Sequence, residues 1–105
     1  MTVQKLLGIL GLAGRAGRLV FGQSRVLAGI RDGSVHHVVL DGAAAGNTRD
    51  AVQRACRHHQ VSLMELKEDE QLGASVGRPA VRVVGVVDEL FAQQLRGGDG
   101  TGTEV

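Results

Sequence analysis

The run HHVVLD at residues 36–41 constrains the fold more than any other part of the sequence. Its apolar residues are consecutive rather than alternating, which is typical of a short strand that is covered on both faces. Such a strand belongs to a sheet with helices on both sides, and it argues against a sheet with one face in water. The sequence therefore predicts an α/β domain built around a buried sheet.

Four short apolar runs alternate with segments of helical periodicity. Strands are predicted at residues 19–21, 36–41, 61–66 and 81–87, and helices at residues 2–13, 22–33, 47–59, 69–75 and 88–95. Gly33 is expected to end the second helix, and Asn47, with Asp50 three positions later, is expected to cap the third. Right-handed crossovers make the first three strands parallel. The expected buried faces carry Ala51, Val52, Ala55, Cys56 and His59 in the third helix and Leu90, Phe91 and Leu95 in the last.

The chain of 105 residues has the length of one domain. Residues 1–96 are expected to form it, and the glycine-rich tail at residues 97–105 is expected to be disordered. The single cysteine, Cys56, excludes an internal disulfide and fits a reducing compartment. The first apolar segment is amphipathic and too short to cross a bilayer. We therefore expect a soluble, cytoplasmic monomer without a membrane partner.

Charge is distributed unevenly along the chain. Residues 1–60 carry eight basic and three acidic side chains, whereas residues 61–105 carry four basic and eight acidic ones. The two parts thus differ in sign, at +5 and −4. The basic part is compatible with an anionic partner, and solvated helix faces are the alternative explanation.

The candidate catalytic and cofactor residues do not stand at the positions that such sites require. The glycines of GLAGRAG, residues 11–17, end a helix, whereas a dinucleotide loop opens one after a strand. The histidine pairs at residues 36–37 and 58–59 are expected to approach one edge of the sheet, but adjacent strand residues point to opposite faces. Cys56 lies mid-helix, where nothing stabilises a thiolate. The sequence therefore predicts a protein that is not an enzyme and has no metal or cofactor.

A surface remains as the candidate functional feature. The helix that starts at Gly22 offers free backbone N–H groups and the positive end of its dipole to an anion. Gln23, Ser24 and Arg25 add side-chain donors, and Arg18 is expected to approach from the preceding turn. The loop GAAAGN at residues 42–47 and the turn GRPA at residues 77–80 are expected at the same sheet edge. Converging donors of this kind suit the backbone of a bent or unpaired RNA element.

Three motifs give the chain a family resemblance over about residues 3–95. They are AGRLVFG at residues 16–22, GNT at residues 46–48, and LGxxxGRP at residues 72–79. With them the sequence resembles small bacterial members of the ribosomal protein L-seven-Ae / L-thirty-e superfamily. The resemblance implies a three-layer α/β/α sandwich with a four-stranded mixed sheet, in which the last strand is inserted antiparallel between the first two. It also implies binding to kink-turn or related internal-loop RNA through three segments.

The first of these segments is a Gly-x-Asn-Glu-x-x-Lys motif at a helix start. It corresponds here to Gly22, Gln23, Ser24, Arg25 and Ala28, so the glycine is kept but the acidic and lysine positions are not. Arg25 offers a phosphate contact, yet it cannot replace a carboxylate that accepts from guanine edges.

The other two segments follow the second strand and precede the last. Where the family has Glu-Asp, this chain has Gly42-Ala43. The third segment is close to the bacterial pattern and consists of Arg78, Pro79, Ala80 and Val81.

The predicted function is non-enzymatic binding of structured RNA. The expected partner is ribosomal or kink-turn RNA, in association with the ribosome. The expected contacts are Arg18, Gly22, Gln23, Ser24, Arg25, Asn47, Arg78, Ala80 and Val81. The alternatives are a protein-interaction or regulatory module on the same fold and an accessory domain of an RNA-modifying enzyme.

Overall fold

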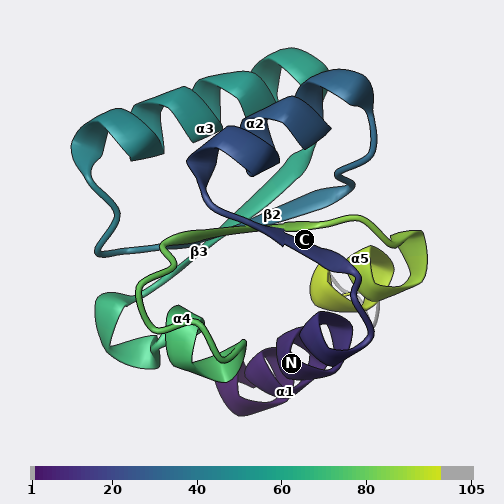
Figure 1. Cartoon of the computed structure of the whole chain (residues 1–105), viewed down its shortest axis with the longest axis vertical. Helices are drawn as coiled ribbons and strands as arrows, with labels where there is room; N and C mark the ends of the chain where they lie inside the picture. The colour runs from purple at the N-terminus through teal and green to yellow at the C-terminus, as the bar shows by residue number, and fades with distance from the viewer. Residues whose placement is uncertain (1, 98–105) are drawn as a thin grey trace.

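A computed structural model of the chain describes residues 2–97, and the remainder of the predicted tail lies outside the described residues (Figure 1). The elements in chain order are α1 (Val3–Arg15), β1 (Leu19–Phe21), α2 (Gln23–Asp32), β2 (His37–Asp41), α3 (Gly46–His59), β3 (Ser62–Leu66), the 3₁₀ turn η1 (Glu68–Glu70), α4 (Leu72–Ser75), β4 (Val83–Val86) and α5 (Glu89–Leu95). Among these residues, no helix combines the length and the apolar character needed to span a membrane.

The four strands form one mixed sheet in the order β1-β4-β2-β3. β2 and β3 are parallel, and β4 lies antiparallel between β1 and β2. The first three strands therefore run in the same direction, as the crossover rule predicts. Their carboxyl ends meet the start of β4 at one edge, where Phe21 pairs with Val84 and Leu40 pairs with Val83. This edge is called the Gly22 edge below.

Successive residues of β2 enter two separate cores. Val39 packs with Leu10 of α1 and Leu95 of α5, whereas Val38 and Leu40 face the side covered by α2 and α3. Figure 1 shows α2 and α3 over one face of the sheet and α1, α4 and α5 over the other. Both faces of β2 are thus buried, as the continuous apolar run predicts. The three-layer α/β/α sandwich with a four-stranded mixed sheet is confirmed.

The two glycines that bound α2 explain why this helix has sharp ends. Gly22 has φ 92° and ψ 157°, a conformation that is essentially restricted to glycine, and Gly33 ends the helix in the left-handed region at φ 86°. Between them, Val26 and Ile30 are buried against the sheet. The predicted helix is confirmed, one residue shorter at each end because the two glycines cap it.

The predicted cap of α3 is wrong. The helix begins at Gly46 after Ala45, so Asn47 lies inside the first turn, where its side chain accepts from the adjacent N–H of Thr48 at 2.9 Å. The cause lies upstream, because the Asp41 side chain accepts from the N–H of Ala43 at 2.8 Å and turns the chain early. Asp50 consequently does not stand at the capping-box position.

The predicted burial of His59 is also wrong. His59 is exposed because it lies in the last turn of α3, next to Gln60, where a left-handed residue redirects the chain toward β3. Val52 and Cys56 form the buried stripe of this helix, with Ala51 and Ala55 half-buried.

The C-terminal third differs from expectation in two places. The predicted helix at residues 69–75 is split, because Gln71 adopts a left-handed conformation between η1 and α4. Leu90, expected in the core, has 70% of its surface exposed. It stands on the face of α5 opposite to Ala92 and Leu95, since two residues advance a helix by more than half a turn. The β2, β3 and β4 ladders are one to three residues shorter than predicted.

Candidate nucleic-acid interface

The starts of two helices lie side by side at the Gly22 edge. α2 begins directly after Gly22, and α3 begins directly after Ala45. Neither start is capped by a side chain, and neither first turn contains an acidic residue. The first N–H groups of a helix have no backbone acceptor within it, and here, within residues 2–97, only that of Thr48 is bonded, to Asn47. The helix dipole adds positive potential at both starts. Together the two starts form a surface suited to anions.

A hydrogen bond between side chains fixes these two starts relative to each other. The Thr48 hydroxyl in α3 donates to the side-chain carbonyl of Gln23 in α2 at 2.8 Å. Gly22 is held as well, because its N–H donates to the carbonyl of Val83 in β4 at 3.1 Å. Ser24, Arg25 and Asn47, by contrast, are exposed in the same turns. The structure therefore brings five of the expected contact residues together: Gly22, Gln23, Ser24, Arg25 and Asn47.

The turn before β4 reaches this surface through a cation–π contact. The guanidinium carbon of Arg78 lies 4.2 Å from the ring centroid of Phe21, the residue that precedes Gly22. The turn itself is closed by the Val81 N–H, which donates to the Arg78 carbonyl at 3.0 Å. Ala80 is exposed in this turn, and Val81 is half-buried. Phe21 is not among the contacts predicted from the sequence, although its place directly before Gly22 is a usable signal.

Gly73 explains why the turn sits close to α4. A Cβ atom at this position would lie 2.5 Å from the carbonyl oxygen of Arg78 and 2.8 Å from that of Pro79. The Gly73 carbonyl in turn accepts from the Arg78 N–H at 2.8 Å. The first glycine of the LGxxxGRP motif thus lets two backbone segments touch, which positions the Arg78 side chain.

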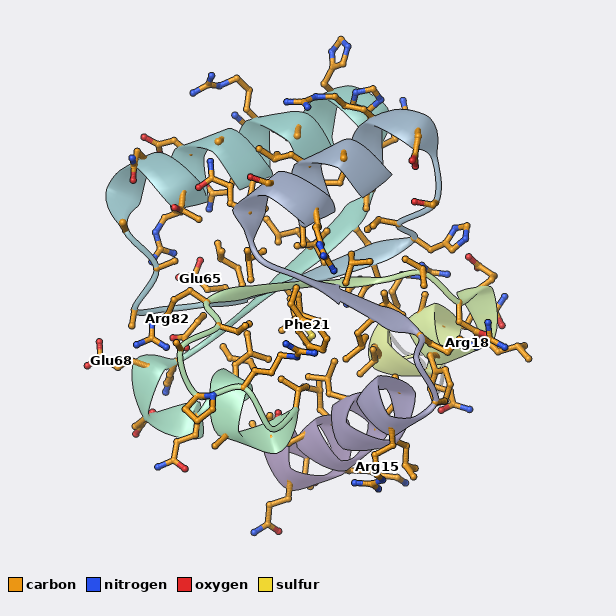
Figure 2. All side chains as sticks on the ribbon, in the orientation of Figure 1. Arg15, Arg18, Phe21, Glu65, Glu68 and Arg82 are labelled. Carbon is orange, nitrogen blue, oxygen red and sulfur yellow. The ribbon has the colours of Figure 1, made fainter. Side chains whose placement is uncertain are left out.

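Two carboxylates at the Gly22 edge are paired with arginines. Asp41 is buried, and its carboxylate lies 3.8 Å from Arg82, whose guanidinium also donates to the Pro79 carbonyl at 3.1 Å. Arg49 forms an ion pair with Glu65 and also donates to the backbone carbonyl of Gly42. Figure 2 shows Glu65, Glu68 and Arg82 gathered at this side of the molecule. Within residues 2–97, Arg25 and Arg78 form no ion pair, so their charges face outward.

The expected approach of Arg18 to this surface is wrong. Its carbonyl accepts from the Val87 N–H at 3.0 Å, and its guanidinium lies 3.8 Å from the Asp88 carboxylate. Arg18 and Gly22 stand on either side of the extended strand β1, which separates them by about 13 Å. Figure 2 accordingly shows Arg18 at the opposite edge of the sheet from Arg82, and Arg15 on α1.

The departures from the family motif have a structural basis at Gly42. Its N–H donates to the Leu66 carbonyl at 2.7 Å, and a Cβ at this position would lie 2.9 Å from that oxygen. A larger residue therefore requires the end of β3 to move. Ala28 and Ala43 are exposed and contribute no polar group.

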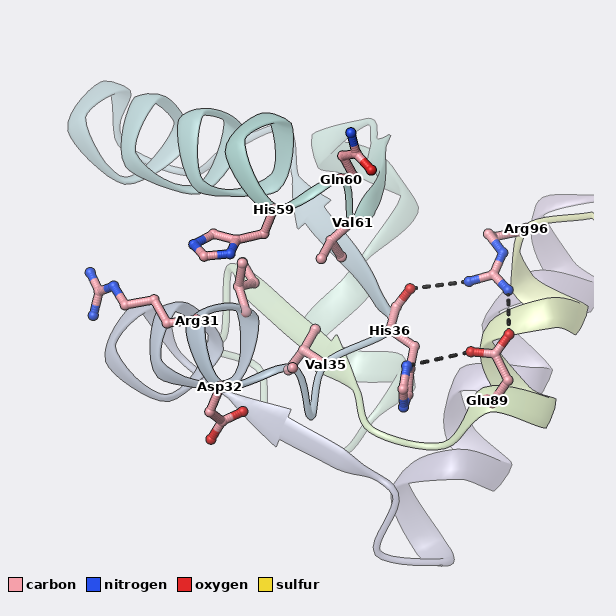
Figure 3. Close-up of a pocket in the computed structure, with 11 residues that line it drawn as sticks. Arg31, Asp32, Val35, His36, His59, Gln60, Val61, Glu89 and Arg96 are labelled. Atoms are coloured by element: carbon pink, nitrogen blue, oxygen red, sulfur yellow. Dashed lines mark hydrogen bonds and ion pairs between the residues drawn. The ribbon is translucent and has the colours of Figure 1, made fainter.

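One histidine of each predicted pair reaches a common cavity at the opposite edge of the sheet. His36 and His59 line one cavity of about 470 Å³ (Figure 3). His37 instead is buried, with Nδ1 2.6 Å from the Ser62 hydroxyl, and burial lowers its pKa to about 4. Glu89 accepts from Arg96 at 2.8 Å and lies 3.4 Å from the His36 ring. Over residues 2–97 no three His, Cys, Asp or Glu side chains are close enough to hold a metal ion.

Cys56 is an unsuitable nucleophile. It is 3% exposed in α3, and burial raises the pKa of its thiol to about 11. A protonated, covered thiol neither attacks nor coordinates.

Two curated relatives are both called RNA-binding protein YlxQ. The one from Enterococcus faecium is 31% identical over 93 residues, which are 89% of each chain. The one from Bacillus subtilis (strain 168) is 36% identical over 87 residues, which are 83% of this chain and 87% of that protein.

Solved structures share the fold. A protein with unknown function from Bacillus halodurans C superposes with a TM-score of 0.84 at 30% identity, covering 89% of this chain and 94% of that chain. A Giardia lamblia 15.5kD RNA binding protein superposes with a TM-score of 0.73 at 15% identity, covering 90% and 84%. The model of one family matches residues 4–96. The chain therefore belongs to the ribosomal protein L7Ae/L30e/S12e/Gadd45 family.

Proposed function

We propose that this protein binds structured RNA through the Gly22 edge and acts without catalysis. The observation that carries the proposal is the pair of adjacent, uncapped helix starts, which have no acid in their first turns. Arg25 and Arg78 flank these starts with unpaired charge. Backbone donors and arginines of this kind contact phosphates. The family and the names of the two YlxQ relatives support RNA as the anion.

The RNA that fits best is a bent internal loop of the kink-turn type, such as those of ribosomal RNA. The two helix starts and the Arg78 turn arrive from different directions, so a sharply bent strand can contact all three, whereas a straight duplex cannot. The chain has two aromatic residues, and Phe21 is already covered by Arg78. Stacking of splayed bases therefore contributes little, and shape and phosphate position carry the recognition.

A comparison of bent and straight RNA tests this function. The affinity for a kink-turn hairpin is measured against that for a duplex of equal length over a range of salt concentrations. Preferential binding to the hairpin that persists at high salt is expected. Equal, weak binding to both, lost steeply with salt, would leave only a nonspecific basic surface.

Charge reversal at Arg25 locates the contact. Arg25→Glu places a carboxylate among the free N–H groups of α2 and is expected to cost about 1–3 kcal/mol of binding while the fold stays intact. Lys5→Glu is the matched control, because it changes the charge equally on exposed α1, across the sheet. Equal affinities of the two variants for the hairpin would show that the RNA binds elsewhere.

A protein-interaction or regulatory module on the same fold is the second candidate. It is favoured by the small apolar residues Ala28, Gly42 and Ala43 at the positions where the family contacts RNA. Partners from a pull-down that survive nuclease treatment would support it. Partners that vanish with the RNA would exclude it.

A further inference from the structure

The outer surface between α2 and α3 carries a second feature with the character of a binding site. An open groove of about 340 Å³ runs between the two helices. Its apolar part is formed by Leu27, Ala51 and Ala55, whose side chains are all half-buried. Its polar part is formed by Arg31, Arg54, His58 and His59. We call it the α2–α3 groove.

The charge of this groove is of one sign. Among its lining residues within the described part of the chain there is no carboxylate. The carboxylates on the two helices are Asp32, whose oxygen accepts from the Ser34 N–H at 2.8 Å, and the exposed Asp50, and neither lines the groove. Arg31 and Arg54 have no ion-pair partner among residues 2–97. Their charge is therefore available to an external anion.

Helix stability alone does not account for these residues. The dipole of α2 favours Arg31, which stands in its last turn. Arg54, however, lies in the middle of α3, where the dipole gives no such advantage. Figure 3 shows His59 at the end of α3 beside Arg31 at the end of α2, so the two walls of the groove converge on the same space.

The groove continues directly from the Gly22 edge. α2 and α3 follow strands of the same direction, and their starts are joined by Thr48 and Gln23. Arg25 and Arg31 are six positions apart, which is about 9 Å along the axis of α2. Leu27 and Arg31, one turn apart, stand on the flank of α2 that faces α3, whereas Arg25 stands about 120° around the helix from Arg31. An RNA strand held at the helix starts therefore meets Arg31 and Arg54 by way of the joined residues Gln23 and Thr48.

We propose that the α2–α3 groove binds the sugar–phosphate backbone of a stem that flanks the RNA loop held at the Gly22 edge. The inference rests on the proposed function, because the loop fixes where the stem begins. Arg31 and Arg54 donate to phosphates, and the apolar floor lies beneath the ribose edges. The contact is independent of sequence, since phosphates carry no base information.

The test uses the full chain and two RNAs. Both contain the same kink-turn loop. One has stems trimmed to the shortest that close the loop, and the other has both stems extended by a full helical turn. The groove variant combines Arg31→Gln with Arg54→Gln. The control variant combines Lys5→Gln with Arg15→Gln on α1, which removes the same charge across the sheet. Circular dichroism checks that each variant is folded.

The groove variant is expected to bind the long-stemmed RNA more weakly than the parent and to bind the trimmed RNA equally well. Two lost phosphate contacts lower the slope of log affinity against log salt by about 2. When the salt concentration rises from about 50 to 200 mM, both proteins lose affinity for the long-stemmed RNA, and the loss is roughly tenfold larger for the parent than for the variant. The control variant is expected to match the parent on both RNAs.

Two results would overturn the proposal, and they differ from each other. If groove and control variants bind the long-stemmed RNA alike while Arg25→Glu weakens both RNAs, the groove has no role and the proposed function stands. If Arg25→Glu changes neither RNA, the proposed function fails, and the groove's role as its extension fails with it.

Discussion

A methyl group at Gly73 is expected to displace the Arg78 turn and weaken RNA binding. A Cβ at this position meets the Arg78 oxygen at 2.5 Å and the Pro79 oxygen at 2.8 Å. Both are backbone atoms, so no side chain can rotate away. Relief to an ordinary contact of about 3.4 Å requires a shift of roughly 0.9 Å between α4 and the turn. That shift also stretches the hydrogen bond from the Arg78 N–H to the Gly73 carbonyl.

The cost of Gly73→Ala follows from two opposed effects. Overpacking costs about 1–3 kcal/mol, and the gain of alanine over glycine in a helix returns about 0.5–1 kcal/mol. A net loss of about 1–2 kcal/mol in the free energy of unfolding is expected, which leaves a typical domain folded. RNA affinity is expected to fall about 5- to 10-fold, because one arginine contact is misplaced.

Gly8→Ala is the matched control for Gly73→Ala. Gly8 lies exposed in α1, and a Cβ there has no atom within 4 Å. This variant is expected to gain about 0.5–1 kcal/mol and to bind RNA as the parent does. Urea denaturation and fluorescence anisotropy with a labelled hairpin measure the two quantities. Equal stability of the two variants would refute the steric reasoning, and a destabilised Gly73→Ala with unchanged affinity would remove the Arg78 turn from the interface.

Three other predictions follow from single contacts. Burial and Arg96 lower the pKa of His37 from 6.5 to about 4, so the folded state takes up its proton less readily than the unfolded state. The free energy of unfolding, measured by urea denaturation, is therefore expected to fall by about 2–3 kcal/mol between pH 7 and 4.5. The variant His37→Gln should not show this loss. Parallel pH profiles of the parent and the variant would contradict the prediction. Phe21→Leu removes the ring under Arg78 and is expected to weaken hairpin binding about 2- to 5-fold by anisotropy, whereas unchanged affinity would show that the stacking does not position the arginine. Ala45→Asp supplies the missing cap of α3, so it should raise the free energy of unfolding by about 1 kcal/mol and lower RNA affinity in the same assays. A rise in both quantities would show that this helix start does not contact phosphate.

The layers of the fold were predictable because local sequence and tertiary structure agree in them. The continuous apolar run of β2 requires cover on both faces, and Gly22 and Gly33 mark the ends of α2 by their own conformations. The position of β4 between β1 and β2 was not predictable from periodicity. Strand order depends on which edges pair across the whole chain, and only the family resemblance supplied it.

The residues of the candidate site were predictable only in part. Residues adjacent to Gly22 lie where a strand-to-helix connection must place them. Arg18 is also near in sequence, yet an extended strand carries it to the other edge. The predicted cap at Asn47 is wrong for a different reason. The start of α3 is set by the hydrogen bonds of Asp41 to the Arg82 carbonyl just before β4 and to the N–H of Ala43. A local capping pattern does not contain this long-range information.

The residues at the Gly22 edge differ from the family motif in one consistent way, because acidic positions of the motif are lost. The close approach of Gly42 to the end of β3 leaves no room for a side chain without movement of that strand. Arg25 stands where the motif has an acid, and Arg49 holds the nearby Glu65. The two helix starts, Arg25 and Arg78 all offer donors, and donors match phosphates rather than guanine edges that need an acceptor. A surface of this composition distinguishes RNA molecules by the path of their backbone, so bent and straight RNA should differ more in affinity than two bent RNAs of different sequence.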